Sequence, residues 1–252
     1  MISNKPYNFV DRTGEIHITN EGYPIKIIGY TNYNNCTIIF IDNGYIKHVS
    51  YGEIVKKSIR NPYHPSVYGT GYLGQGDYLT SVGGNHTVCY RRWKNLIGRC
   101  YSNKFCINTK VYRDIFVCEA WKCFQVFAQW HEENWKEYMD SLWDLDKDLL
   151  VKGNKIYSPE TCCFVPHEIN TSMMDTKEYR GKYPKGVKKD GNRFAARLNG
   201  KHLGLFLTPE EAFTVFKVAK EIYIKEVADK WKPFIKDEIH QIMYDYRVNI
   251  TD

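Results

Sequence analysis

The sequence contains no apolar run near the length of about 18 residues that a membrane-crossing helix needs. Its first residues, Met-Ile-Ser-Asn-Lys-Pro-Tyr, include no apolar leader segment, so we expect the chain to stay in the cytosol. Eight cysteines are present without a Cys-x-x-Cys pair, which argues against a zinc ribbon. In the cytosol they are expected to remain reduced thiols. These absences exclude membrane-spanning and disulfide-rich secreted proteins.

The composition is that of a folded protein. Of 252 residues, 43% are hydrophobic and 15% aromatic, which is enough apolar surface to offset the entropy of ordering the chain. The length allows one large domain or two to three small ones. Changes of periodicity along the chain favour the second arrangement. We expect an α+β protein whose segments cover residues 1–62, 63–86, 87–180 and 181–252.

The net charge of +6 is concentrated in one segment. Residues 181–207 hold seven Lys and Arg against one acid, whereas residues 119–148 hold eight acids against three lysines. One basic face and one acidic pocket indicate a polyanionic partner and a bound cation. The alternative is that both runs are ordinary solvated surface.

Residues 1–62 show short β-rich runs that are separated by turn signals rich in Asn, Asp and Gly. Four or five short strands in this space predict a small SH3-like β-barrel, which could also receive a protein partner. Residues 63–86 contain six glycines, so a linker or an extended arm is expected there.

Between residues 88 and 139 the spacing of apolar residues becomes helical. The first helix carries its apolar residues on one side, and a second stripe of aromatic residues follows between positions 121 and 138. Both stripes are interpreted as packed core. Arg91 and Arg92 fall elsewhere on the first helix, where they either line a path for phosphate groups or are simply solvated.

Residues 184–230 predict a three-stranded sheet followed by a helix. Asn199-Gly200 between the last two strands is the signature of a type I′ hairpin turn. Thr208 and Glu211 then form a capping-box sequence. The helical residues expected to face the sheet are Ala212, Val215, Phe216, Ala219, Ile222 and Tyr223.

The middle strand alternates, so that Arg193 and Arg197 take the face opposite to Phe194. The segment 186–212, with its Leu-Gly-x-Phe-x-Thr-x-Glu-Glu-Ala string, resembles the AP2/ERF DNA-binding domain. The resemblance implies that the sheet lies in the major groove of double-stranded DNA. The residues expected to contact DNA are Lys188, Lys189, Arg193, Arg197, Lys201 and His202, together with Arg91 and Arg92 of the helical region.

A second resemblance lies within residues 145–170. The strings Leu-Asp-Lys-Asp, Gly-Asn and His-Glu-Ile-Asn resemble the HNH (ββα-metal) nucleases, in the degenerate form seen in phage and prophage proteins that carry AP2 domains. The resemblance implies two strands and a helix, with Asp146 and Asn170 holding Mg²⁺ or Mn²⁺ and Asn154 in the hairpin. It also implies a phage or prophage protein of a bacterial host cell, with no organic cofactor.

Lys147 stands where the HNH family has the histidine that activates water, so the identity of the base is open. An ammonium cannot accept a proton unless burial lowers its pKa by several units. Tyr157 is the first alternative base, because a neighbouring ammonium lowers the pKa of a phenol. His167 lies one turn before Asn170 and either faces the metal or is a capping or surface histidine.

Three carboxylates alternate along the first strand of this frame. If the alternation is strict, Asp144, Asp146 and Asp148 share one face. They either raise the affinity of the site for a cation or form a solvated edge.

Two functions fit these features best. The first is a sequence-specific DNA endonuclease or nickase, and the second is a DNA-binding protein that has kept the nuclease fold without catalysis and acts as a regulator or an anti-defence factor. A third class is a protein-interaction module built around the N-terminal barrel. DNA binding is common to the first two functions, and Lys147 is the residue that separates them.

Overall fold

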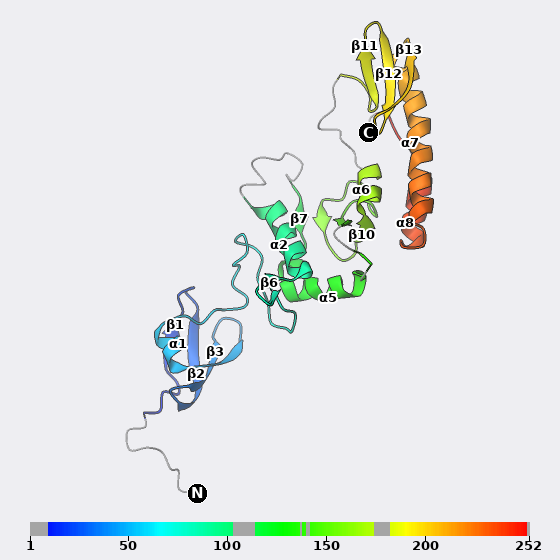
Figure 1. The fold of residues 1–252 in the computed structure, drawn as a ribbon. Coiled ribbons are helices and arrows are strands. Elements are labelled where there is room, and N and C mark those ends of the chain that lie inside the picture. The colour runs from blue at the N-terminus through cyan, green and yellow to red at the C-terminus, as the bar shows by residue number, and fades with distance from the viewer. Residues whose placement is uncertain (1–9, 103–113, 137, 140–141, 174–181, 251–252) are drawn as a thin grey trace. The chain divides into compact units, whose positions relative to one another are not determined.

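The computed structural model describes residues 10–102, 114–136, 138–139, 142–173 and 182–250 (Figure 1). Helices and strands are mixed, so the expected α+β class is confirmed. The chain divides into an N-terminal unit, Met1–Asp77 with Cys123–Gln125, and a C-terminal unit, Tyr78–Lys122 with Val126–Asp252. Within the described residues, no helix has both the length and the apolar character needed to cross a membrane.

The N-terminal unit is built on a four-stranded antiparallel sheet and one short helix. Its elements are β1 (Ile16–Ile18), β2 (Pro24–Asn32), β3 (Asn35–Phe40), β4 (Ile46–Val49) and α1 (Tyr51–Val55). Each strand pairs only with its neighbours in sequence, and β1 does not pair with β4 within the described residues. The sheet is therefore open, and the expectation of a closed barrel is wrong. With three residues, β1 is too short to close the sheet against β4.

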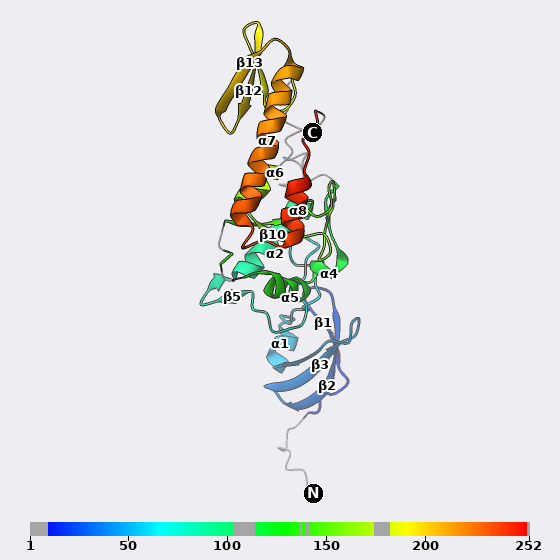
Figure 2. The ribbon, with the colours of Figure 1, turned by 90° about the vertical axis from the view of Figure 1, so that its right-hand side faces the viewer.

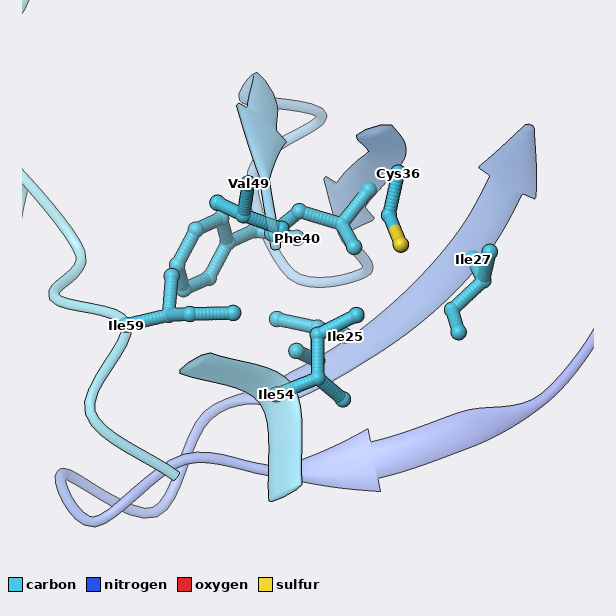
Figure 3. Close-up of a cluster of buried hydrophobic side chains, with 8 residues drawn as sticks. Ile25, Ile27, Cys36, Phe40, Val49, Ile54 and Ile59 are labelled. Atoms are coloured by element: carbon cyan, nitrogen blue, oxygen red, sulfur yellow. The ribbon is translucent and has the colours of Figure 1, made fainter. Parts of the chain in front are cut away.

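The core of this unit lies between the sheet and α1. Alternate residues of β2 and β3 point to one side, where Ile27, Ile38 and Phe40 are completely buried. Figure 3 shows Ile54 of α1 facing the same cluster. Ser50 begins α1 with a capping box, which satisfies backbone N–H groups that have no partner within the helix.

Part of the expected linker is an ordered arm. The backbone carbonyls of residues 72–73 accept hydrogen bonds from the N–H groups of residues 124–125, at 2.9 and 3.3 Å. A side chain at Gly74 would collide with the Sγ atom of Cys123, so this close approach requires glycine. After the arm comes a short hairpin formed by β5 (Ser81–Val82) and β6 (Asn85–His86).

The first part of the C-terminal unit is largely helical. Its elements are α2 (Val88–Tyr101), α4 (Glu119–Lys122), most of α5 (Phe124–Asn134) and the parallel pair β7 (Phe116–Val117) and β9 (Ile156–Tyr157). Thr87 caps α2, because its Oγ1 accepts the N–H of Tyr90 at 3.2 Å. Trp93 is completely buried, and its Nε1 donates to the carbonyl of Trp121 at 2.8 Å. The apolar stripe of α2 is core, as predicted. In the second stripe Trp121 and Phe127 are completely buried, but the prediction is wrong for Tyr138, which is 52% exposed.

A strand pair and a short helix follow. β8 (Trp143–Asp146) and β10 (Cys163–Pro166) are antiparallel, and α6 (His167–Met173) begins directly after β10. Between β8 and β10 in sequence lies β9, which pairs with β7, so the paired strands are not consecutive as the expected frame of two strands and a helix has them. Val165 and Ile169 are completely buried and join the two elements in one hydrophobic cluster.

The last part of the chain is a sheet with two helices. Its elements are β11 (Val187–Asp190), β12 (Arg193–Leu198), β13 (Lys201–Phe206), α7 (Pro209–Trp231) and α8 (Asp237–Asp245). The two ribbon views show α7 running along the sheet (Figure 1 and Figure 2). Asn199 and Gly200 have φ angles of 48° and 80°, which confirms the predicted turn. Thr208 and Glu211 form the predicted capping box.

α7 packs against two hydrophobic clusters in succession. Phe216 belongs to the cluster under the sheet, and Ile224 belongs to the cluster with α6, α8 and β10. The predicted contact face is correct for Ala212 and Phe216 but wrong for Ile222, which is 53% exposed. Lys220 lies on the buried side instead, because steps of four residues place it between Phe216 and Ile224 on one stripe.

Candidate functional site

The carboxylates of β8 lie on the side of the strand pair that α6 covers. In the register, Asp144 lies opposite Val165 and Asp146 opposite Cys163. Residues directly opposite share a face of the pair, and Val165 and Cys163 pack with Ile169 of α6. Asp144 and Asp146 therefore share this face, about 7 Å apart along the strand.

Asp144 contacts two side chains of α6. Its Oδ2 accepts a hydrogen bond from Asn170 Nδ2 at 2.8 Å and lies 2.7 Å from His167 Nδ1. His167 and Asn170 are three residues apart, so they project from the same side of the helix. The side chain of His167 is 60% exposed and that of Asp144 is 34% exposed. These three residues, called the Asp144 cluster below, are open to solvent.

The side chain of Asp146 contacts the loop after β8, whereas that of Asp144 contacts α6. Its Oδ1 accepts the backbone N–H groups of Asp148 and Leu149, at 2.9 and 2.6 Å. Burial, and next the charge of Asp148, raise the pKa of Asp146. The carboxylate expected beside Asn170 was Asp146, and the structure has Asp144 there. The antiparallel register explains the difference, because Asp144 is two residues closer to the start of α6.

The side chains of Lys147 and Asn154 form hydrogen bonds within the same loop. Lys147 Nζ donates to Asp148 Oδ2 at 2.9 Å and to the carbonyl of Asn154 at 3.0 Å. Asn154 Nδ2 donates to the carbonyls of Lys147 and Ile156, at 2.6 and 2.7 Å. Lys147 therefore acts as a hydrogen-bond donor inside the loop, which is a poor position for a proton acceptor.

Tyr157 is an internal residue. It is only 4% exposed and belongs to β9, opposite Val117 of β7. Water has little access to a phenol in this position, so the structure offers no support for Tyr157 as the base that activates water.

The donor set of the Asp144 cluster is one carboxylate, one amide and one imidazole. Carboxylate and amide oxygens suit Mg²⁺ and Mn²⁺, and Mg²⁺ is often held by one or two carboxylates, waters and the phosphates of its substrate. Among the described residues, neither this cluster nor any other place brings three His, Cys, Asp or Glu side chains together in a group that could hold a metal ion. The residues present therefore fit a cation that the substrate helps to hold.

The sheet of β11–β13 presents one cationic face. Lys188 lies opposite Ala195, and His202 lies opposite Arg197. Lys188, Arg193, Arg197 and His202 thus share the side of the sheet turned away from α7, and all four are exposed. Asp190 lies opposite Arg193 on the same face, but within the described residues no ion pair joins a carboxylate to these four side chains, which are called the cationic face below.

Lys189 and Lys201 belong to the other side of the sheet. Lys189 lies opposite Phe194 and Lys201 opposite Leu198, and both of these apolar residues pack toward α7. The two lysines are exposed at the margin of the sheet. They are therefore separated from the cationic face, although the sequence placed all six residues together.

Arg92 is packed into the C-terminal unit, whereas Arg91 is exposed. Arg92 Nη1 donates to the carbonyl of Trp143 at 3.0 Å, and its guanidinium lies 4.1 Å from the ring centroid of Trp135. Burial lowers the pKa of Arg92. Arg92 is thus engaged in a hydrogen bond to the first residue of β8. Of the two arginines, Arg91 is the one whose side chain is exposed.

Asp144 is the residue of the cluster that the family resemblance did not assign. The alternation of acids along β8 was the available signal, since it put Asp144 and Asp146 on one face without showing which acid meets the helix.

The chain matches no family model, no curated protein and no solved structure. The resemblances to AP2/ERF and HNH proteins therefore rest on the residues described above.

Proposed function

We propose that this protein binds double-stranded DNA and hydrolyses phosphodiester bonds in it with the help of a divalent cation. The observation that carries the proposal is the Asp144 cluster, in which three polar side chains with contacts of 2.7 and 2.8 Å meet at an exposed junction of strand and helix. The cationic face lies in the same unit of the chain. The surface proposed to bind the polyanion and the site proposed to bind the cation thus belong to one folded unit.

The shape and charge of the cationic face support binding in a DNA groove. Three strands spaced by about 4.8 Å give a ribbon about 10 Å across, and the major groove is about 12 Å wide. Lysine and arginine side chains on an exposed face neutralise phosphates and can reach base edges. Specificity for a sequence would come from Arg193, Arg197 and His202, which lie on the neighbouring strands β12 and β13.

Asp144 and Asn170 are the residues that would hold the cation. Bound Mg²⁺ or Mn²⁺ polarises a phosphate and lowers the pKa of water. His167 presents Nδ1 to Asp144, which leaves Nε2 as the ring atom that can accept a proton from outside the cluster. Asn154 keeps the neighbouring loop in one conformation.

The alternative is a DNA-binding protein without catalysis. It is favoured by Lys147, which occupies the position of the family's base and donates two hydrogen bonds within its loop. Nicking of supercoiled plasmid by the purified chain separates the two functions. Conversion that requires Mg²⁺ or Mn²⁺ and stops on chelation supports the enzyme, and DNA binding without conversion supports the alternative.

Two matched variants locate the chemistry. Asp144→Asn removes the charge of a metal ligand, so metal-dependent nicking should fall by more than about 100-fold, because losing only an outer partner of a ligand already costs up to that much. Asp146→Asn keeps an oxygen that can accept the two backbone N–H groups, so nicking should persist. Both variants should bind plasmid as tightly as the parent. An active Asp144→Asn together with an inactive Asp146→Asn would refute the assignment.

A further inference from the structure

Glu168 follows His167 in α6, and its side chain reaches the end of α7. Its Oε2 accepts a hydrogen bond from Trp231 Nε1 at 2.8 Å and another from Lys230 Nζ at 2.5 Å. Glu168 lies in the first turn of α6, whereas Lys230 and Trp231 lie in the last turn of α7. The carboxylate therefore links the beginning of the short helix to the end of the long one.

The indole ring of Trp231 also contacts the strand that carries Asp144. Its centroid lies 6.0 Å from that of Trp143 in an edge-on arrangement, and Trp143 directly precedes Asp144 in β8. Trp231 packs against two hydrophobic clusters, one that contains Ile169 of α6 and one that contains Trp143. One side chain thus touches both of the segments that supply the Asp144 cluster.

α6 takes its orientation from such contacts because it has only seven residues. A helix of this length is not stable by itself in water, so tertiary contacts must hold it. The backbone N–H of His167 donates to the carbonyl of Leu142 at 2.6 Å, which fixes the start of the helix. A hydrogen bond is directional and apolar packing is not, so the bond between Glu168 and Trp231 fixes the rotation of α6 about its axis.

We propose that Glu168 is a positioning residue of the Asp144 cluster and that Trp231 is the partner through which it acts. The inference rests on the proposed function, because it concerns the same metal site. The hydrogen bond between the two side chains keeps α6 in the orientation in which His167 and Asn170 both reach Asp144, at 2.7 and 2.8 Å. Glu168 acts through these residues rather than on the cation or the DNA.

Substitutions at Glu168 test the proposal through the single-turnover rate of nicking and the affinity for plasmid. Glu168→Ala removes the acceptor, so the rate should fall by about 10- to 100-fold, the usual cost of losing an outer partner of a metal ligand, while the affinity stays at the parent's value. Glu168→Gln keeps an oxygen that can accept the indole N–H, so it should restore most of the rate. Lys230→Met is the matched control and should keep the parent's rate, because it removes an exposed ion pair and leaves the indole bond in place.

A double-mutant cycle shows whether Glu168 acts through Trp231. Trp231→Phe keeps an aromatic ring beside Trp143 but has no N–H to donate, so it should slow nicking by itself. Combined with Glu168→Ala, it should cost no more than the larger of the two single losses, because both changes remove the same bond. Additive losses would overturn the proposal, and so would a fully active Glu168→Ala or a Glu168→Gln that is as slow as Glu168→Ala.

The ring nitrogen signals of His167 in NMR spectra make the test independent of activity. In Glu168→Ala the Nδ1 signal should move toward its position in Asp144→Ala, which lacks the contact, and in Glu168→Gln it should stay at the parent's position. A parent that binds DNA and never nicks it refutes the catalytic part of the proposed function alone. The His167 signal then decides, since a shift in Glu168→Ala supports the positioning role and an unchanged signal overturns it.

Discussion

His131 lies in the core of the C-terminal unit, stacked on Trp135 at 5.5 Å and edge-on to Phe164 at 5.4 Å between ring centroids. It is 6% exposed, and its Nε2 has no hydrogen-bond partner among the residues that the structure describes. Burial, and then the charge of Arg92, lower the pKa of His131 from 6.5 to about 4. At the scale of the single residue, the surroundings therefore keep this imidazole neutral.

We expect acid to destabilise the C-terminal unit through His131. The unfolded chain binds the proton near pH 6.5 and the folded chain only near pH 4, so stability is complete above the first value and declines toward the second. The loss over this window is about 3 kcal/mol. Urea unfolding of the parent at pH 7 and pH 4.5 measures it.

The control is His131→Phe, which keeps an aromatic ring in the core and cannot be protonated. Its free energy of unfolding should change less between pH 7 and pH 4.5 than that of the parent. Equal losses in the two proteins would show that another group controls the acid sensitivity.

At the scale of the element, alternation along β12 and the register with its two neighbours decide which cations act together. Arg193 and Arg197 lie on the cationic face, while Lys189 and Lys201 lie at the margin on the α7 side. The two pairs carry the same charge and belong to the same sheet. They differ in which side of the sheet they occupy.

This difference gives a matched test of DNA binding. Arg193→Ala with Arg197→Ala should weaken binding and lower the log–log salt slope by up to about 1.8, since each lost phosphate contact contributes about 0.9. Lys189→Ala with Lys201→Ala removes the same charge and should change the slope less. Titration of a labelled duplex at several salt concentrations measures both. Equal effects would mean that net charge, rather than the cationic face, controls binding.

At the scale of the whole molecule, the chain consists of two units with separate cores. All six tryptophans belong to the C-terminal unit, at positions 93, 121, 130, 135, 143 and 231. Tryptophan fluorescence therefore reports the unfolding of that unit alone. Hydrogen exchange of β2 and β3 reports the N-terminal unit.

Ile38→Ala should destabilise the N-terminal unit selectively. Ile38 is completely buried in that unit, so the truncation should cost about 2–5 kcal/mol. Amide exchange in β2 and β3 should become faster, while the denaturant midpoint followed by tryptophan fluorescence should stay at the parent's value. A shift of that midpoint would show that the two units unfold together.

Features that depend on a few neighbouring residues were predictable. The Asn199-Gly200 turn and the capping box of Thr208 and Glu211 involve contacts within four residues, so the amino-acid order is sufficient to predict them. The buried apolar face of α2 followed from helical spacing. The candidate site was predictable in part, since Asn170 and His167 were chosen correctly as neighbours on one helix, one turn apart.

The sequence by itself determined the three strands, the hairpin turn and the capped helix of residues 184–230, the helical spacing of α2, and the gathering of cations in one sheet. Only the tertiary structure decided that Asp144 rather than Asp146 meets Asn170, that Arg92 is half-buried against Trp135, and that Lys220 is buried. It also decided that the N-terminal sheet stays open. The physical reason is the same each time: strand register and helix packing depend on contacts between segments far apart in the chain, which local spacing does not contain.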